Sequence, residues 1–398
     1  MTLRAPSASE LDLPAIKGLA VTMARELGAA EARVTAAFPD DESQRRLRES
    51  FARGDLATWG FDHRYAREAT DPRGLLSGAR SVICLAFPYA TSPPALPGVL
   101  RGRVSNYAWS SDYHVRVRAV LVRIAAAIDR AAGQPVTAVA CDTRPLAERA
   151  FAARSGLGWV GKHTNLIATA LGSFVFLGEI VTTLALPPDV PLRKSCGSCA
   201  RCVDVCPTRA LRGDYTIDAT RCIADLTQRT DGIPRDMRPL LGDWVWGCDL
   251  CQLACPPTLA AGSRGNPVRD APIEASTAAP ALISLLRLRS GEFKRRFQKT
   301  AMGWRGAAVL RRNAAVALGN CLDRSAIPAL VLALDEDSHP MVRGHVAWAL
   351  GRIGAPSAIS ALRRRNRVEG DSSVRDEIAA ALAPFETFDR SSRSTGEL

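Results

Sequence analysis

Residues 195–211, SCGSCARCVDVCPTRAL, contain four cysteines, and a proline follows the fourth. The spacing C-x2-C-x2-C-x3-C-P is typical of bacterial ferredoxins, in which three thiolates hold one 4Fe-4S cluster and the fourth reaches a second cluster. The pattern therefore requires further ligands elsewhere in the chain. WGCDLCQLACP (246–256) supplies three cysteines with a proline behind them, and TRCIADL (220–226) supplies an isolated fourth.

These eight cysteines are sufficient for two clusters. The crossed ferredoxin pattern assigns the first 4Fe-4S cluster to Cys196, Cys199, Cys202 and Cys255. It assigns the second 4Fe-4S cluster to Cys206, Cys222, Cys248 and Cys251. Structural zinc held by two C-x2-C knuckles is the alternative, but it leaves four cysteines unexplained. The other three cysteines, Cys84, Cys141 and Cys321, have apolar neighbours and are expected to be small core residues.

Composition restricts the compartment and the partners. The chain has 398 residues, of which 47% are hydrophobic, so it can bury ordinary cores without a disulfide scaffold. The N-terminal stretch carries acids and a proline where a secretory signal needs an apolar run, and no window has the apolar length of a membrane span. We expect a cytoplasmic protein with reduced thiols and no membrane contact. A net charge of +12 favours a polyanionic partner.

The sequence predicts several domains. Residues 1–190 predict an α/β (α+β) domain, a layered sheet covered by helices: apolar runs at 79–89, 135–143 and 172–186 indicate strands, and 112–133 indicates a helix that ends at Gly133. Residues 191–265 form a ferredoxin-like insert for the two clusters.

The C-terminal region repeats. RRNAAVALG (311–319), RGHVAWALG (343–351) and RDEIAAALA (375–383) recur at intervals of 32 residues, which predicts an all-α, HEAT-like domain over 280–385. The polar residues 386–398 predict a disordered tail.

Basic residues in this region have two readings. Arg311, Arg343 and Arg375 recur at one position of the repeat, and Asp337 and Asp371 precede the last two, so we expect an Asp-Arg ladder between repeats. The non-periodic runs FKRRFQK (293–299) and LRRRNR (362–367) are candidate polyanion contacts, and a solvated helix face is the alternative.

Four segments together resemble the epoxyqueuosine reductase family. They are CGSCARCVDVCPTRAL (196–211), GCDLCQLACP (247–256), CDTRPLAERAFAARSGLGWVGKHTNLI (141–167) and WRGAAVLRRNAAVALGN (304–320). The resemblance implies an oxidoreductase that uses cobalamin, fed by two 4Fe-4S clusters, to reduce the epoxide of epoxyqueuosine at the tRNA wobble position to queuosine. It also implies a monomer, a tRNA with a queuosine-type anticodon as partner, and an external electron donor. Because the chain has no Asp-x-His-x-x-Gly motif, a base-off cobalamin is expected.

The resemblance assigns the catalytic proton to Asp142. This residue follows an apolar strand at its C-terminal edge, where we expect partial burial to raise its pKa and keep it protonated near neutral pH. A turn or N-cap aspartate is the alternative. His114 is expected to be a hydrogen-bonded structural residue.

The resemblance also indicates contacts with cobalamin. Lys162 is expected near the phosphate of the nucleotide tail, and the apolar candidates either line the corrin or pack in the core. The expected cofactor-binding residues are Ser105, Lys162, Leu166, Leu177, Ile180, Thr227 and Asp249. CIADLT (222–227) departs from the family in having Ala224 and Asp225 where relatives often carry serine and an aromatic residue, which leaves the contacts there open.

Two other functions share parts of this pattern. Reductive dehalogenases also combine cobalamin with two clusters, but that function predicts an export signal and no helical repeats. A non-enzymatic electron-transfer scaffold, with the repeats docking a partner protein, is the third reading.

Overall fold

The computed structural model describes residues 11–89, 100–262 and 275–393. Contacts divide the chain into two compact units, each discontinuous in sequence. The first unit takes residues 1–92, 112–222 and 249–272, and the second takes 93–111, 223–248 and 273–398. The segment 223–248 thus groups with the C-terminal helices instead of with the cysteine stretches on either side of it. The boundaries expected from the sequence, at 190, 265 and 280, stay predictions.

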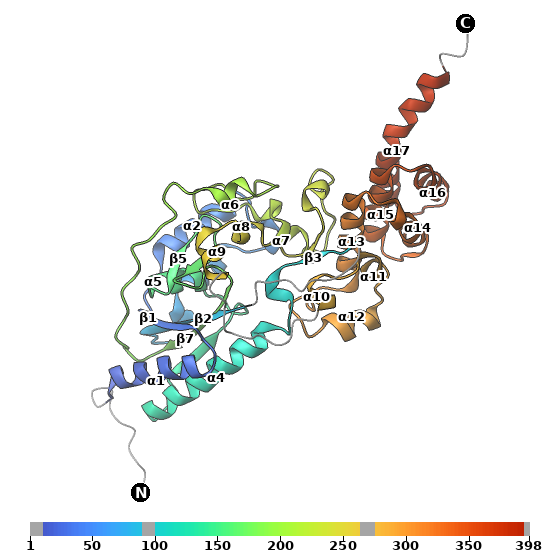
Figure 1. Ribbon diagram of the computed structural model, residues 1–398. Coiled ribbons are helices and arrows are strands. Elements are labelled where there is room, and N and C mark those ends of the chain that lie inside the picture. Colours follow the sequence, from blue (N-terminus) through green and yellow to red (C-terminus); the bar gives the residue numbers. More distant parts are fainter. Residues whose placement is uncertain (1–10, 90–99, 263–274, 394–398) are drawn as a thin grey trace. The chain divides into compact units, whose positions relative to one another are not determined.

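A four-stranded antiparallel sheet forms the centre of the first unit (Figure 1). Its strands lie in the order β1 (Glu31–Ala36), β2 (Ser81–Pro88), β7 (Val175–Thr182) and β4 (Thr137–Ala140). β2 is buried at every position. Since all neighbours are antiparallel, the unit is of the α+β kind, with the helix-covered sheet that the sequence predicted.

Helices cover both faces of this sheet. α1 (Leu13–Glu26) and α4 (Tyr113–Ala132) lie on one face, and α5 (Glu148–Arg154) lies on the other (Figure 1). α4 ends at Gly133, whose φ of 70° is the left-handed C-cap expected from the sequence. A Cβ at Gly178 of β7 would lie 2.8 Å from a methyl carbon of Val117, so this glycine lets α4 approach the sheet closely.

The remaining elements of the first unit are short. They are α2 (Asp41–Ala52), η1 (Ala57–Trp59), α3 (His63–Thr70), η2 (Pro72–Gly74), β5 (Gly158–Val160), β6 (Leu166–Ala168), α6 (Arg201–Asp204), η4 (Ala219–Arg221), α8 (Leu250–Leu253) and α9 (Pro256–Gly262).

A buried aspartate fastens the cysteine-rich stretch to the rest of the first unit. Asp55 is 1% exposed, and its carboxylate accepts two hydrogen bonds from Arg212, at 2.6 and 3.0 Å. Its carbonyl oxygen accepts the N–H of Ala219 at 2.8 Å. The loop between Cys206 and Cys222 is therefore held by paired charges and by the main chain.

The second unit is mainly helical. Its elements are β3 (Arg103–Val104), η3 (Asn106–Ala108), α7 (Ile223–Leu226), η5 (Arg238–Leu241), β8 (Trp244–Trp246), α10 (Ala275–Ala278), α11 (Leu282–Leu286), α12 (Ser290–Phe297), α13 (Ala307–Cys321), η6 (Arg324–Ala326), α14 (Ile327–Glu336), α15 (Pro340–Ile353), α16 (Pro356–Asn366) and α17 (Ser372–Arg393). β3 and β8 pair in parallel.

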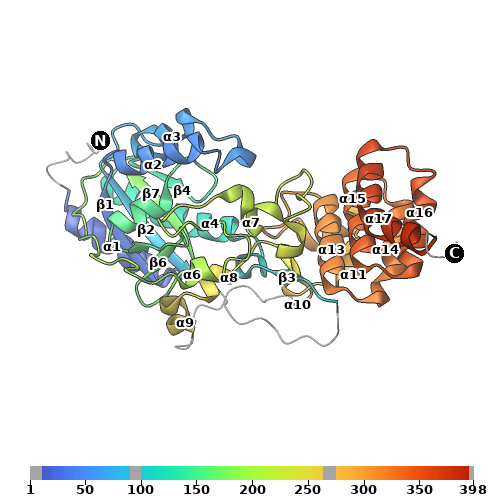
Figure 2. The same cartoon turned by 90° about the horizontal axis from the view of Figure 1, so that it is seen from above.

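Stacked helices account for the 32-residue repeat. The three repeated motifs lie in α13, α15 and α17, which pack side by side (Figure 2). A Cβ at Gly319 would lie 2.9 Å from the Cα of Ala349, and one at Gly351 would lie 3.0 Å from the Cα of Ala381. The glycine of the motif therefore recurs because neighbouring helices touch there through their backbones. This confirms the predicted helical repeats.

The expected ladder of ion pairs forms in part. Arg375 donates to the carbonyl oxygens of Glu369 and Gly370, and Arg343 has a different partner from the one expected. Arg311 donates from Nε to Asp337 Oδ2 at 2.7 Å, as predicted. Arg343 instead pairs with buried Glu369, at 2.8 and 3.0 Å. Glu369 lies 32 positions after Asp337 and so keeps the period, whereas Asp371 accepts N–H groups at the start of α17. Both pairs join one repeat to the next.

The repeats also bind the segment 223–248 through its main chain. The fully buried guanidinium of Arg312 donates to three carbonyl oxygens between residues 226 and 231, at 2.5 to 2.9 Å. Asn313 donates through Nδ2 to the carbonyl oxygens of Thr227 and Val245, at 2.7 and 2.8 Å. The helical repeats thus hold the segment that joins Cys222 to Cys248.

Two expectations about the C-terminal part differ from the structure. Cys321 is exposed at the end of α13, although Cys84 and Cys141 are buried as expected. α17 continues to Arg393, beyond the predicted start of a disordered tail at 386, because polar residues can extend a helix that packing has already nucleated. Residues 394–398 lie outside the described part. No described helix combines the length and the apolarity needed to span a membrane.

Candidate functional site

The four predicted ligands of the first cluster, Cys196, Cys199, Cys202 and Cys255, all belong to the first unit. Burial raises the pKa of the Cys202 thiol, and charges on Cys196, Cys255 and Cys199 raise it further. Burial also raises the pKa of Cys255, with added contributions from Cys196 and Cys199. Cys202 and Cys255 therefore each lie within electrostatic reach of Cys196 and Cys199, although Cys255 is distant in sequence. Among the described residues the structure shows no three metal-ligating side chains already gathered around one point, so this ligand set stays a prediction.

The four predicted ligands of the second cluster are divided between the two units. Cys206, Cys222 and Cys251 belong to the first unit, and Cys248 ends a segment of the second. α6, which precedes Cys206, and α8, which contains Cys251, pack against each other. This ligand set stays a prediction.

Lys162 lies at the loop of the first set. Its N–H donates to the Sγ of Cys196 at 3.4 Å, and its Nζ donates to the carbonyl oxygen of Gly197 at 2.9 Å. Hydrogen bonds to thiolate sulfur are among the factors that set the potential of an iron-sulfur cluster. The structure thus places this predicted cofactor residue against the ligand loop, with its ammonium group already bonded.

Asp142 lies directly after Cys141, which follows the last residue of strand β4. Its φ of 54° is in the left-handed region, which is sparsely populated for residues other than glycine. Its Oδ2 accepts a hydrogen bond from the Tyr113 hydroxyl at 2.9 Å and lies 3.2 Å from Nε2 of His114. Its N–H donates to Glu148 Oε1 at 2.5 Å. The side chain and the main chain of this residue are both fixed.

The expected protonation of Asp142 is wrong for this conformation. Its side chain is 62% exposed, and the hydrogen bond from His114 holds the pKa of the carboxyl below its ordinary value. The prediction assumed burial, but the dominant influence is a neighbouring group from another element. The carboxyl is therefore ionised near neutral pH.

His114 lies between two carboxylates. Its Nδ1 is 2.6 Å from Asp112 Oδ1, and its Nε2 faces Asp142. Burial lowers the pKa of His114, but the hydrogen bonds to Asp142 and Asp112 outweigh it, so the pKa is raised. Of these two groups, His114 therefore holds the proton in preference to the carboxyl group of Asp142.

Sequence reasoning connected none of three neighbours with Asp142, although His114 is hydrogen-bonded as expected. Tyr113 and His114 open α4, and Glu148 opens α5. The stretch DYH (112–114) holds two titratable groups beside a helix N-cap, which was the available signal. Nothing local in the sequence connects it to a residue 28 positions later.

A small cavity lies beside this group of residues. Its volume is about 130 Å³. It is lined by His114, Val115, Arg118, Leu121, Val139, Ala140, Cys141 and Thr143. It is well below the roughly 300–1,000 Å³ of ordinary ligand pockets, so it suits water or a small group.

The apolar residues expected around a corrin do not share one face. Leu166 and Leu177 pack into one core cluster with Phe151, on the α5 side of the sheet. Ile180 is fully buried and lies three positions after Leu177 on the same strand, so its side chain points to the opposite face.

Ser105 and Thr227 flank one glycine in the second unit. The Thr227 hydroxyl accepts the N–H of Gly247 at 2.9 Å and donates to the carbonyl oxygen of Ile223 at 2.8 Å. A Cβ at Gly247, whose φ is 66°, would lie 2.5 Å from the Cβ of Ser105. Asp249, fully buried, stands at the N-cap of α8.

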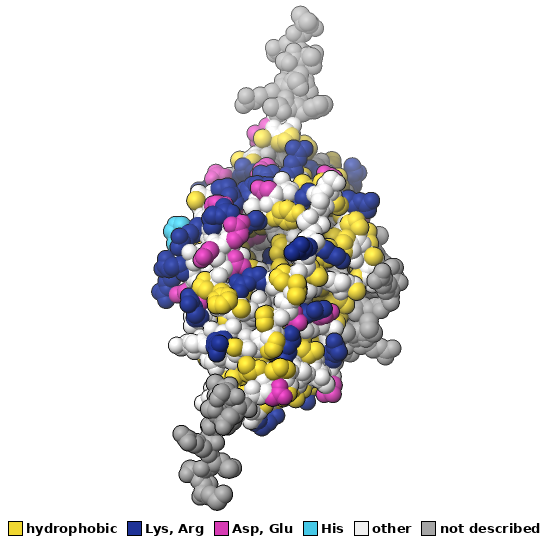
Figure 3. Space-filling view, turned by 90° about the vertical axis from the view of Figure 1, so that its left-hand side faces the viewer, with side chains coloured by type: hydrophobic (Ala, Val, Ile, Leu, Met, Phe, Trp, Pro, Cys, Tyr) yellow, Lys and Arg dark blue, Asp and Glu magenta, His cyan; other side chains and the backbone are white. Residues whose placement is uncertain are grey.

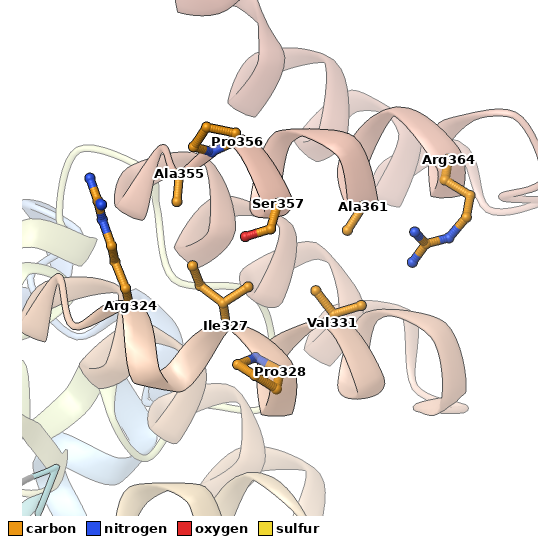
Figure 4. Close-up of a pocket in the computed structure, with 9 residues that line it drawn as sticks. All are labelled: Arg324, Ile327, Pro328, Val331, Ala355, Pro356, Ser357, Ala361 and Arg364. Carbon is orange, nitrogen blue, oxygen red and sulfur yellow. The ribbon is translucent and has the colours of Figure 1, made fainter.

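A larger groove of about 650 Å³ lies between α14 and α16 (Figure 4). Figure 4 shows Ile327 and Val331 along it, with Arg324 and Arg364 towards its two ends. Arg364 also pairs with Asp335 at 3.1 Å, as a solvated surface residue does.

Family models match three parts of the chain. "4Fe-4S double cluster binding domain" matches residues 195–258, "HEAT repeats" matches 306–383, and "Epoxyqueuosine reductase QueG, DUF1730" matches 70–143. A two-cluster module joined to a helix-covered sheet and helical repeats defines an iron-sulfur oxidoreductase.

Comparisons over the whole chain identify the family of oxidoreductases to which it belongs. An epoxyqueuosine reductase of Bacillus anthracis is 32% identical over 376 residues, covering 94% of this chain and 98% of the relative. A crystal structure of epoxyqueuosine reductase with an epoxyqueuosine-modified tyrosine tRNA stem loop has a TM-score of 0.87 at 30% identity, covering 94% of this chain and 99% of that one. The Bacillus subtilis enzyme, solved with an aspartate catalytic loop swung out of the active site, has a TM-score of 0.86 at 30% identity, with the same coverage. The chain belongs to the epoxyqueuosine reductase family.

Proposed function

We propose that this protein reduces the epoxide of epoxyqueuosine in a tRNA anticodon to the alkene of queuosine. The finding that supports it most directly is the match of residues 195–258 to a 4Fe-4S double cluster binding domain, which suits a low-potential electron carrier, in a chain of this family. Two 4Fe-4S clusters deliver electrons from an external donor. The protein acts in the cytoplasm as a monomer.

Protons come from the Asp142 site. Converting an epoxide to an alkene and water consumes two electrons and two protons, so an acid must stand near the leaving oxygen. His114 carries a proton next to the Asp142 carboxylate, at 3.2 Å. Substrate that covers the exposed Asp142 removes water from it, which raises its pKa and favours transfer of this proton to the carboxylate. Asp142 then protonates the epoxide oxygen.

Cobalamin is proposed on the resemblance, and the residues of this chain fit it only in part. Leu166 and Leu177 share an apolar cluster, but Ile180 faces the other side of the sheet. Lys162 and Thr227 already use their polar groups inside the protein. When bound, cobalamin would supply a cobalt centre that passes electrons from the clusters to the epoxide. Base-off binding is expected because no axial-histidine motif is present.

Transfer RNA is the proposed partner. The net charge of +12 favours a polyanion. Lys294, Arg295 and Lys299, in and just after α12, are exposed, as are Arg363 and Arg367 at the end of α16. On the face shown in Figure 3, Lys and Arg side chains occur at many places with acidic side chains between them. Binding through phosphates predicts an affinity that falls steeply with salt.

One experiment tests the function. The protein is reconstituted anaerobically with iron, sulfide and cobalamin, given a chemical reductant and epoxyqueuosine-containing tRNA, and the nucleosides are analysed. We expect queuosine to appear. Asp142→Asn should retain its iron but lose activity by about 100-fold or more, the size of a missing proton donor. An unchanged epoxide with the unmodified protein would overturn the proposal.

A further inference from the structure

A buried acid lies behind the catalytic loop. Glu179 is in the middle of β7, opposite Cys84 of β2 and Ala140 of β4, and its side chain is fully buried. Among the described residues its carboxyl oxygens make no hydrogen bond of good geometry, and Glu148 is the charged side chain that acts on it most strongly. An ionised carboxylate in such a place is strongly disfavoured, so this side chain keeps its proton. Burial and the charge of Glu148 accordingly raise the pKa of Glu179 well above its ordinary value.

Glu148 connects this acid to Asp142. It opens α5, and its Oε1 accepts the N–H of Asp142 at 2.5 Å. Burial and the charge of Asp142 raise the pKa of Glu148 to about 7. Two adjacent carboxyl groups with raised pKa values titrate as a pair, so near neutral pH they hold at least one proton between them.

Among the described residues no basic side chain donates a hydrogen bond to the pair, although the charge of Arg149 partly opposes the rise in the pKa of Glu148. Arg149 and Arg154, on the same helix as Glu148, donate instead to the carbonyl oxygens of Thr164 and of residues 36 and 38. The thiols that face the pair, Cys84 from β2 and Cys141 after β4, have raised pKa values and stay neutral. The hydroxyl of Tyr113 is neutral too, since burial raises its pKa. His114 bonds Asp142 and Asp112 rather than the pair.

The main chain of Asp142 depends on this arrangement. A left-handed φ at a non-glycine residue persists only where its surroundings hold it. Tyr113 and His114 bond the side chain of Asp142, whereas Glu148 bonds its N–H. A relative has been solved with an aspartate catalytic loop swung out of its active site, so a loop of this kind can leave its place.

We propose that Glu148 and Glu179 are positioning residues, a carboxyl pair sharing one proton that keeps the Asp142 loop in its active conformation. The inference rests on the proposed role of Asp142. With one proton present, Glu148 stays beside Glu179 and accepts the Asp142 N–H. When the last proton leaves, two like charges adjoin in a dry site, Glu148 withdraws, and the loop is released.

Amide hydrogen exchange of residues 141–147 tests this directly in the cluster-loaded protein. Glu148→Ala removes the acceptor, and we expect the protection factor of this segment to fall about 10-fold or more, the size of one strong hydrogen bond. Glu148→Gln keeps an acceptor oxygen and should restore most of the protection. The surface variant Glu68→Gln, which loses only an exposed pair with Arg64, is the matched control and should change nothing.

The pH profile of kcat separates a shared proton from simple packing. In the native protein we expect kcat and loop protection to fall together at alkaline pH, as the pair loses its last proton. Glu179→Gln cannot ionise and should abolish that alkaline fall, with KM for tRNA unchanged. Glutamine has nearly the volume of glutamate, so this variant remains informative if Glu148→Ala unfolds.

Two results would overturn the inference: protection and kcat within twofold of native in Glu148→Ala, or an unchanged alkaline fall in Glu179→Gln. A failure of the proposed role of Asp142 is recognised separately, because Asp142→Asn would then keep its activity while the exchange measurement still reports on the pair.

Discussion

Replacing Asn313 with leucine tests whether the helical repeats hold the segment between Cys222 and Cys248. Asn313 is fully buried. Its Nδ2 donates to the carbonyl oxygens of Thr227 and Val245, at 2.7 and 2.8 Å. Its Oδ1 accepts two N–H groups of Arg312, at 2.8 and 2.9 Å. The side chain therefore ties two distant points of the segment to α13.

The expected loss of stability on substitution follows from these four hydrogen bonds. Leucine has a similar volume but leaves two carbonyl oxygens and two guanidinium N–H groups without partners. Each buried polar group that loses its hydrogen bond costs about 1–3 kcal/mol, so the free energy of unfolding should fall by at least about 4 kcal/mol. A folded domain has only about 5–15 kcal/mol in total. We expect the segment, and with it the ligand Cys248, to become mobile.

Urea unfolding of the anaerobic, cluster-loaded protein, followed by circular dichroism, measures the loss. With a slope of about 2–3 kcal/mol per molar urea, the midpoint of the affected transition should fall by at least about 1.3–2 M. Bound iron should also fall, by up to the content of one cluster. The control is Asn366→Leu, at the exposed end of α16, which should stay within about 0.5 kcal/mol. A loss below about 1 kcal/mol with full iron would refute the reasoning.

Three further predictions concern single side chains. Cys255→Ser should remove the first cluster and leave the second, so iron analysis and electron paramagnetic resonance should show about half the native content. Glu369→Gln should cost up to about 3 kcal/mol at pH 7, because hydrogen bonds, chiefly from Arg343, outweigh burial and hold the pKa of Glu369 at about 2 instead of 4.5. Since this pKa is lowered, the stability is present above pH 4.5 and is lost as the pH falls towards 2, so thermal melts of variant and native protein should converge there. The pKa of His114 is raised and that of Asp142 is lowered, so the ion pair between them contributes fully to stability between about pH 4 and 6.5. His114→Gln should therefore lower the melting temperature slightly in that window and progressively less outside it.

The sequence by itself determined the two-cluster module and the helical repeats. Cysteine spacing is covalent, so a turn that aims Cys196, Cys199 and Cys202 at one centre is encoded within seven residues. The 32-residue period likewise predicts stacked helices, because each unit can bury its apolar face only against the next. The strands at 79–89 and 172–186 were readable for the same local reason, an apolar run bounded by turn residues.

Only the tertiary structure decided the surroundings of Asp142. Its pKa depends on His114 of α4, and its N–H donates to Glu148 of α5, whose neighbour Glu179 lies in the middle of the sheet. The use of Glu369 in the ladder, and the attachment of residues 223–248 to Arg312 and Asn313, depend equally on distant partners. Periodicity and ligand spacing are properties of adjacent residues, whereas protonation and loop position are set by whichever charges and donors folding brings within a few ångströms.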